Sequence, residues 1–508
     1  MASEPEPSSA GSAPLRRLHP FSWLFVLLTQ LRPIVLPLLV LLFLGQGEWW
    51  ELFIVVGAVA YALYSLVYSF GFRYRIGADE LLIKEGIFSR TERHIPYARI
   101  QNIVRRRNPL HRIFGVAELR LESAGGTTPE AIMNVITLAA AEELEAVLRG
   151  GHADVATSDA DTPALLALSP GELLRLGLLR NRGGVLVGAA FALAWQFGVW
   201  ESMSFRGAIR AVGSWFFAGT QWFTGPLAML SSILALSILL YLAIKLSSIA
   251  MAFLEFHGFR LVSDGTRVST EGGLLTRNSA SARVDKVQRL VQSDSWLSRR
   301  LGRQWLSCEV AAGLQLDDEN SRTRLQWLAP IGTPAKLEEI VAVLDPGLEL
   351  NRQHWQPLHP RAWHRVAKAG ALMWTLASLP AWYWLGAWAA PIWLILMAFN
   401  YFDARGWARF AAYSCHAGVF AYRSGWLNRE WLITRIAKGQ AIALSSSPFD
   451  RRAGMAKVEL DTAGASQIGS RLQVPYLDEA QARALMQALR LQIDALPVPA
   501  ETKQSHSA

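Results

Sequence analysis

The stretch that decides the fold is GIFSRTERHIPYARIQNIVRRRNPLHRIFGVAELRLESAG, at residues 86–125, because the chain contains it three times. A second copy begins at Gly273 and a third, more divergent copy begins at Gly425. Two glycines and a glutamine keep their places in all copies: Gly86, Gln101 and Gly115, then Gly273, Gln288 and Gly302, then Gly425, Gln440 and Gly454. A repeat of this length predicts an array of similar modules rather than one large domain.

The composition is typical of a membrane protein with polar segments between its spans. Of the 508 residues, 51% are hydrophobic, only 18% are charged, and 20 are tryptophan. The net charge of +9 favours an anionic neighbour, and beside so many apolar segments anionic lipid is favoured over nucleic acid. Cys308 and Cys415, the only cysteines, indicate a reducing compartment and provide neither a disulfide framework nor a metal site.

Apolar segments precede each copy of the repeat. An interfacial helix is expected at residues 21–31, and uncharged runs predict spans at residues 33–47, 52–71, 183–200 and 226–244. The run at 369–402 is tight for two crossings of about 20 residues each, so two short spans and a re-entrant hairpin both remain open there. Arg and Lys gather at the module-bearing ends of the spans, with Arg206 and Arg210 as exceptions, so the positive-inside rule predicts cytoplasmic termini and modules.

A proline-containing triplet opens each unit: Leu18-His19-Pro20, Leu168-Ser169-Pro170 and Leu358-His359-Pro360. The repeating unit is therefore a triplet, a juxtamembrane helix, two spans and a strand-rich module. Because His19 and His359 stand in matching contexts, we interpret them as structural residues at the start of the helix rather than as catalytic bases.

Each module is predicted to consist of short antiparallel strands followed by one amphipathic helix. The first copy has strand patterns at residues 72–76, 81–85, 92–95, 100–105 and 118–122. The closing helices of the three modules are expected at residues 139–148, 334–344 and 477–491. A unit of this kind predicts a pleckstrin-homology (PH)-like half-open barrel.

The motifs make this prediction more specific. The patterns G-x-[FL]-x-R, IPYARIQ at residues 95–101, P-L-x-R-x-x-G at residues 109–115 and the closing Ala124-Gly125 resemble the bacterial membrane-flanked PH-like domain. The whole arrangement resembles the YdbT-like proteins of that family, although the second copy has SARVDKVQ and the third ITRIAKGQ in place of IPYARIQ. The resemblance implies a PH-like barrel and a bacterial inner-membrane location. It implies no established enzymatic activity, and it suggests a smaller membrane protein with one PH-like module as a partner.

The expected fold class is an α+β membrane protein with three transmembrane helix pairs, each followed by a PH-like antiparallel β-barrel capped by a C-terminal helix. The predicted organisation is a disordered tail (1–14), an interfacial helix with the first span pair (15–71), PH-like domain 1 (72–150), a linker (151–167), the second span pair with an aromatic outer loop (168–256), PH-like domain 2 (257–346), the third span pair (357–405), PH-like domain 3 (406–493) and a disordered tail (494–508).

Basic residues at three positions of the repeat are the candidates for lipid or partner contact: Arg90, Arg277 and Arg429; Arg99, Lys286 and Lys438; Arg112, Arg299 and Arg451. Each cation near an anionic leaflet is worth about 1 kcal/mol, but the same residues could instead cap turns or pair with local carboxylates. The cluster Arg105-Arg106-Arg107 occurs only in the first copy. The repeated glutamine is interpreted as a buried amide at a strand end, and the repeated glycines as turn residues.

No constellation of residues points to catalysis. The HExxH, GxSxG, Walker A and CxxC patterns are absent, so no catalytic residue, metal ligand or cofactor is expected, and the acidic run at residues 317–320 is interpreted as a hairpin loop. The predicted spans contain no mid-bilayer carboxylate, lysine or histidine, which argues against a coupled transporter or pump.

Two functions remain. The first is a non-enzymatic scaffold of the bacterial inner membrane, with a possible place in envelope maintenance, whose cytoplasmic modules bind one another, a partner protein or anionic lipid. The second is a lipid or amphiphile handling factor in which the span pairs form a groove, motivated by the aromatic loop at residues 215–223. The expected partners are membrane lipids, the smaller single-module protein and further copies of the chain, with no nucleic acid.

Overall fold

The computed structural model describes residues 15–25, 71–77, 79–86, 90–97, 100–123, 131–148, 163–196, 226–310, 327–348, 353–462 and 472–495, with a few isolated positions between 53 and 63. Several predictions fall outside these residues: the N-terminal tail, the C-terminal tail after residue 495, nearly all of the first span pair, the aromatic loop, the acidic run and Arg99.

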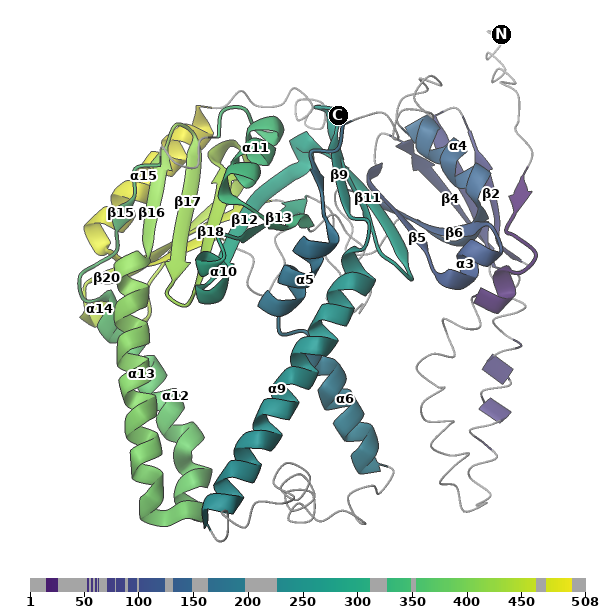
Figure 1. The fold of residues 1–508 in the computed structure, drawn as a ribbon. Coiled ribbons are helices and arrows are strands. Elements are labelled where there is room, and N and C mark those ends of the chain that lie inside the picture. The colour runs from purple at the N-terminus through teal and green to yellow at the C-terminus, as the bar shows by residue number, and fades with distance from the viewer. Residues whose placement is uncertain are drawn as a thin grey trace.

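Three modules follow one another along the chain, and each consists of two antiparallel sheets and a closing helix (Figure 1). We call the first, four-stranded sheet of a module its leading sheet and the second, three-stranded sheet its trailing sheet. Module 1 contains β1 (Arg16–Arg17), β2 (Arg73–Ile76), β3 (Glu80–Glu85) and β4 (Thr91–Pro96), then β5 (Ile100–Arg107), α3 (Pro109–Ile113), β6 (Val116–Ser123), β7 (Ala131–Thr137) and α4 (Leu138–Leu148).

Modules 2 and 3 repeat this order of elements. Module 2 contains β8 (Leu166–Ala167), β9 (Arg260–Ser263), β10 (Arg267–Gly272), β11 (Arg277–Arg283), β12 (Val287–Ser295), α10 (Trp296–Arg300), β13 (Gln304–Val310), β14 (Trp327–Gly332) and α11 (Pro334–Leu344). Module 3 contains β15 (Gln356–Pro357), β16 (Ala412–His416), β17 (Val419–Gly425), β18 (Asn428–Arg435), β19 (Gly439–Ser445), α14 (Pro448–Arg452), β20 (Met455–Thr462), β21 (Leu472–Asp478) and α15 (Glu479–Asp494).

The sheets do not stop at the module boundaries. One seven-stranded sheet has the order β7-β6-β5-β11-β10-β9-β8, so the trailing sheet of module 1 continues into the leading sheet of module 2. A second has the order β14-β13-β12-β18-β17-β16-β15 and joins module 2 to module 3 in the same way. The sheet β1-β2-β3-β4 and the sheet β19-β20-β21 lie at the two ends of the array.

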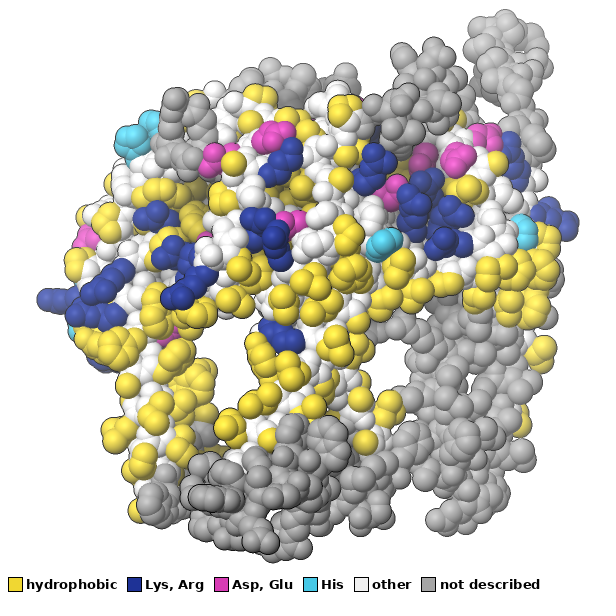
Figure 2. Space-filling model, viewed as in Figure 1, with side chains coloured by type: hydrophobic (Ala, Val, Ile, Leu, Met, Phe, Trp, Pro, Cys, Tyr) yellow, Lys and Arg dark blue, Asp and Glu magenta, His cyan; other side chains and the backbone are white. Residues whose placement is uncertain are grey.

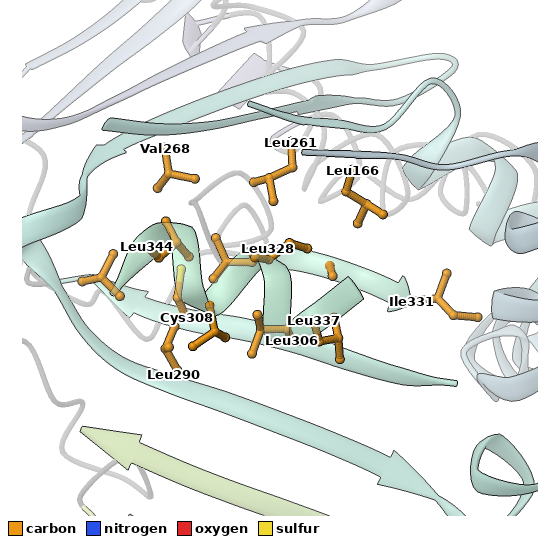
Figure 3. Close-up of a cluster of buried hydrophobic side chains, with 14 of the residues drawn as sticks. Leu166, Leu261, Val268, Leu290, Leu306, Cys308, Leu328, Ile331, Leu337 and Leu344 are labelled. Carbon is orange, nitrogen blue, oxygen red and sulfur yellow. The ribbon is translucent and has the colours of Figure 1, made fainter. Parts of the chain in front are cut away.

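Each module encloses a hydrophobic core between its two sheets and its closing helix. In module 2 this core contains Leu261 and Val268 from the leading sheet, Leu306 from the trailing sheet, and Leu337 from α11 (Figure 3). Thr333 caps α11 by accepting a hydrogen bond from the backbone amide of Lys336, and proline occupies the first turn, as a helix N-terminus favours. The predicted closing helices are thus present in all three modules.

The repeated glycines lie at turns, as the sequence predicts. Gly273 and Gly425 have φ angles of 116° and 105°, and a Cβ atom at either position would collide with the backbone carbonyl of Thr276 or Asn428. The shape of this turn therefore requires glycine. The repeated glutamine varies more: Gln288 is buried and donates to the carbonyl of Lys286 at 3.3 Å, whereas Gln440 is exposed, so the buried-amide interpretation is wrong for the third copy.

The triplets that open the units also have the predicted structural role. The backbone amide of Phe21 donates to Nδ1 of His19 at 3.4 Å, and the amide of Arg361 donates to Nδ1 of His359 at 3.1 Å. Both histidine rings thus close the turn that leads into a helix. The short strands before the triplets, β1, β8 and β15, were not predicted, because two residues are too few to show an alternating pattern.

Long helices project from one side of the modules (Figure 1). They are α6 (Gly183–Gln196), which follows the juxtamembrane helix α5 (Pro170–Leu179), α9 (Pro226–Phe256), α12 (Ala362–Leu385) and α13 (Ala389–Phe410). Within the described ranges, one segment, Ile233–Phe256, is long and apolar enough to cross a membrane, and a shorter apolar helix covers Gly183–Ala194. The prediction of three complete span pairs therefore remains a prediction.

The last two of these helices form a hairpin that turns at Gly386, where φ is 54°. Residues 369–402 thus belong to two helices joined by the 3₁₀ turn Gly386–Trp388. The helices have 24 and 22 residues and are about 36 and 33 Å long at 1.5 Å per residue. Helix α9, at 31 residues, extends beyond the predicted end at residue 244, because Ala252 and Phe256 are part of the core of module 2.

Candidate functional site: the joints and the helix-side rim

The two joints between modules have the same strand register. Val104 of β5 lies opposite Ala280 of β11, and Val291 of β12 lies opposite Leu432 of β18. Val104 and Val291 are each the third residue after the repeated glutamine, and Ala280 and Leu432 are each the seventh after the repeated glycine. Because a slip of one residue would turn every side chain to the other face, the shared register shows that the joint is part of the repeat itself.

The paired strands of each joint contribute to two cores at once. In β5, Ile103 belongs to the core of module 1, and its neighbour Val104 belongs to the core of module 2. In β12 and β18, Leu290 and Ile433 lie opposite each other in the core of module 2, while Leu432 packs against the core of module 3. Alternating side chains therefore bury apolar surface on both sides of each joint.

Several of the predicted basic residues lie at the second joint. Asp294 of module 2 has a side chain only 1% exposed, and its Oδ1 is 2.5 Å from Nη1 of Arg299. Arg299 also donates through Nη2 to the carbonyl of Trp426 in module 3 at 2.9 Å. Arg429 lies opposite Asp294 across the joint, with its guanidinium 4.3 Å from the centre of the Phe410 ring. Burial, followed by the charge of Arg299, lowers the pKa of Arg429.

Lys438 also connects modules 2 and 3. Its Nζ atom donates to the backbone carbonyl of Val287, and burial lowers the pKa of its ammonium group. Nearby, Nε of Arg435 donates to Oδ2 of Asp345 at 2.8 Å and adds a further bond between the same two modules. In Lys286, the matching residue of module 2, the Nζ atom lies 3.9 Å from Oδ2 of Asp285 in the same module.

The first joint is more strongly basic than the second. Arg112 donates through Nη1 to the carbonyl of Leu274 in module 2 at 3.2 Å, and Arg277 forms an ion pair with Glu271, 2.6 Å between Nε and Oε1. Opposite Arg277 stands Arg107, at the repeat position that Asp294 occupies in module 2. Burial, followed by the charges of Arg105, Arg277 and Arg112, lowers the pKa of Arg107.

The remaining candidates are not at the joints. Arg90 is exposed just before β4, and Arg451 is exposed in the last turn of α14. The structure thus places Arg112, Arg277, Arg299, Arg429 and Lys438 at the joints between modules. The repeat pattern identified these positions, but it did not show that Arg112, Arg299 and Lys438 donate to backbone carbonyls of a neighbouring module.

The side of the modules from which the helices project carries exposed apolar side chains, which the sequence interpretation missed. Three of them come from equivalent short helices: Ile113 (75% exposed), Trp296 (50%) and Phe449 (62%). We call this set the helix-side rim, and it also includes Leu110, Leu274, Leu275, Leu297, Leu301 and Leu427. Figure 2 shows the corresponding hydrophobic band below the modules, with Lys and Arg side chains above it. The signal in the sequence was the apolar content of the P-L-x-R-x-x-G motif.

Polar contacts hold the juxtamembrane helix α5 against module 2. Arg303 donates from Nε and Nη2 to the two carboxylate oxygens of Glu172, at 3.0 and 2.8 Å. These bonds lower the pKa of Glu172. Arg180, just after α5, lies over the rings of Phe256 and Trp327, at 5.5 and 4.2 Å, and burial lowers its pKa to about 10. Module 2 and α9 are therefore connected by side chains as well as by the chain itself.

These features define a class: a tandem array of PH-like modules, joined through sheet edges and attached to apolar helices. The bacterial PH domain family matches residues 25–151, 182–342 and 368–493, and the chain belongs to this family. The chain is also similar to the UPF0699 transmembrane protein YdbT of Bacillus subtilis (strain 168), with 23% identity over 296 residues. That alignment covers 54% of this chain and 56% of the relative, so it spans little more than half of the relative's length. No solved structure matches the chain. The predicted YdbT-like arrangement with three PH-like domains is confirmed.

Proposed function

We propose that the chain is a non-enzymatic scaffold of the bacterial inner membrane. Three cytoplasmic PH-like modules form one continuous array, and the exposed sheet edges of that array bind protein partners. The observation that carries this proposal is the register shared by the two joints, because it makes edge-to-edge binding a property of the module rather than of one boundary. Tethering three modules in one chain raises their effective concentration for one another and for a partner.

Lipid contact has a supporting part in this proposal. Arg299, Arg429 and Lys438 already bind groups within the array, so the contact with anionic headgroups is assigned to the helix-side rim and the arginines beside it. Ile113, Trp296 and Phe449 would enter the interfacial layer. The exposed Arg300 and Arg451, in the last turns of α10 and α14, would lie at the level of the phosphates. The rim then holds the array flat against the membrane.

The test is purification of the tagged full-length chain from native membranes in mild detergent, with protein and phospholipid both quantified. If the chain is a scaffold, a protein partner should co-purify in stoichiometric amount. The edge variant Ala443→Arg should lose this partner, and the matched variant Ala484→Arg should retain it. Both alanines are exposed, one on β19 and the other on α15, so both variants should fold. Co-purified lipid without any stoichiometric protein would overturn the proposal and favour amphiphile handling.

A further inference from the structure

Among the strands that the structure describes, β4 at one end of the array and β19 at the other are sheet edges of complementary kind. From this we infer that β19 of one copy is the docking site for β4 of a second copy of the same chain. This inference deepens the proposed scaffold function, on which it rests, by naming the partner and the pairing. It follows from the exposure of the two edges, from their places in the repeat, and from the charges that they carry.

Both end strands are exposed where their counterparts inside the array are covered. In β19 only Gly439 and Ile442 are partly buried, and the other residues are exposed, whereas the equivalent strand β12 is largely buried. In β4 only Ile95 is buried. An exposed edge strand presents unpaired backbone donors and acceptors to any strand that can align with it.

The two edges are also of the kinds that pair within the chain. Strand β19 occupies the repeat position of β5 and β12, and β4 occupies the position of β11 and β18. At both joints the first strand of a trailing sheet pairs with the last strand of a leading sheet. Applying the same register to β19 and β4 places Ala443 opposite Arg93, Ile442 opposite His94, and Ser445 opposite Thr91.

The charges favour this pairing over the pairing of β4 with a second copy of β4. Strand β19, with the sequence GQAIALS, contains neither a charged residue nor proline, which are the usual protections of an edge strand. Strand β4, with the sequence TERHIP, contains Glu92, Arg93 and His94. An uncharged edge accepts these residues without placing like charges opposite one another. Pro96 corresponds to Arg283, which lies outside the pairs of the first joint, so it does not interrupt the register.

The placement of the helices agrees with assembly in one membrane. The step from module 2 to module 3 keeps the projecting helices on the same side of the array (Figure 1). A second copy added by a similar step would therefore keep its helices on that side too. Because the interface joins two different edges, repeated addition produces a ring if the rotation closes and an extended row if it does not.

The first experiment is disulfide crosslinking between two differently tagged full-length copies, co-expressed and kept in native membranes. Ser445→Cys in one copy and Thr91→Cys in the other should give a crosslinked dimer. The matched control replaces Thr91→Cys with Glu85→Cys, which lies beside Thr91 on β3, one strand further from the edge, and should not crosslink. Equal crosslinking of both pairs, or of neither, would overturn the inference.

The second experiment reverses a charge across the proposed interface and measures association of the full chain in nanodiscs or detergent. Ala443→Arg places an arginine opposite Arg93 and should raise the dissociation constant at least tenfold, while Arg93→Glu in the partner copy should restore binding. Ala484→Arg should have no effect. Absence of rescue would show that the register is wrong. If Ser445→Cys captures a different protein and never a second copy, the inference fails while the scaffold proposal stands.

Discussion

The substitution Asp294→Asn tests whether the second joint depends on a buried charge. Asp294 is 1% exposed, pairs with Arg299, lies opposite Arg429, and accepts a hydrogen bond from Nε2 of Gln304 at 3.3 Å. Asparagine keeps the shape and an acceptor for Gln304 but removes the negative charge. Two arginines then face each other across the joint with no carboxylate between them.

The expected cost follows from the exposure of the two partners. Removing one member of a fully buried ion pair costs about 3–5 kcal/mol. The side chain of Arg299 is 23% exposed and can turn partly toward water, so we expect a smaller cost of about 2 kcal/mol. If the joint opens locally, 2 kcal/mol corresponds to amide hydrogen exchange about 30-fold faster in β12 and β18. Hydrogen exchange with mass spectrometry on the full chain in detergent measures this directly.

The control is Glu339→Gln in α11, which removes the ion pair between Glu339 and Lys336. Glu339 is 55% exposed, so its loss should accelerate exchange in α11 by about twofold at most. The double variant Asp294→Asn, Arg299→Gln should cost less than the sum of the single variants, because the two side chains act as a pair. A change of less than about twofold for Asp294→Asn would refute the reasoning and make the joint depend on apolar packing alone.

Three further results are expected. Gly425→Ala should destabilise module 3 by at least about 2 kcal/mol, as measured by hydrogen exchange, because φ is 105° and the carbonyl of Asn428 occupies the place of the Cβ atom. Gly454→Ala should cost only about 1 kcal/mol, because the space around a Cβ atom at that position is open. A nitroxide spin label on Ile113→Cys in nanodiscs should be relaxed more by oxygen than by an aqueous nickel complex. A label on Glu339→Cys should be relaxed more by the nickel complex. If oxygen and the nickel complex relax the label on Ile113→Cys equally, the rim does not contact lipid. Hydrogen bonds from Arg303 lower the pKa of Glu172 in the folded protein. The ionised Glu172 therefore stabilises the fold above the unfolded pKa of about 4.3, and this stabilisation is lost as the pH falls through the lower pKa of the folded state. Protection of α5 should therefore decline below about pH 4 in the wild type and be independent of pH there in Glu172→Gln.

Much of each module could be predicted from local patterns. The strands expected at residues 72–76, 81–85 and 92–95 are β2, β3 and β4 within a residue or two at each end. The turns at Gly273 and Gly425 also follow from the sequence, since glycine readily adopts positive φ. Strand β7 was missed, although it precedes the predicted helix directly.

The candidate site was predicted only in part. The repeat identified Arg299, Arg429 and Lys438 as positions to examine, but a cation that contacts lipid and one that donates to a neighbouring carbonyl look the same in a sequence. The rim was missed for a related reason. An apolar residue such as Ile113 reads as part of a core, and only its 75% exposure shows that it is not.

The sequence by itself determined that the chain contains three related modules, where their strands and turns lie, and which positions all copies share. These properties depend on residues close together in the chain, so local periodicity is enough to show them. Only the tertiary structure decided that Ile103 and Val104 face two different cores and that β5 pairs with β11 and β12 with β18. Strand alternation shows that two faces are buried, but the identity of the covering surface depends on contacts between residues far apart in the chain. For the same reason, the open edges at β4 and β19 become visible only when the modules are seen side by side.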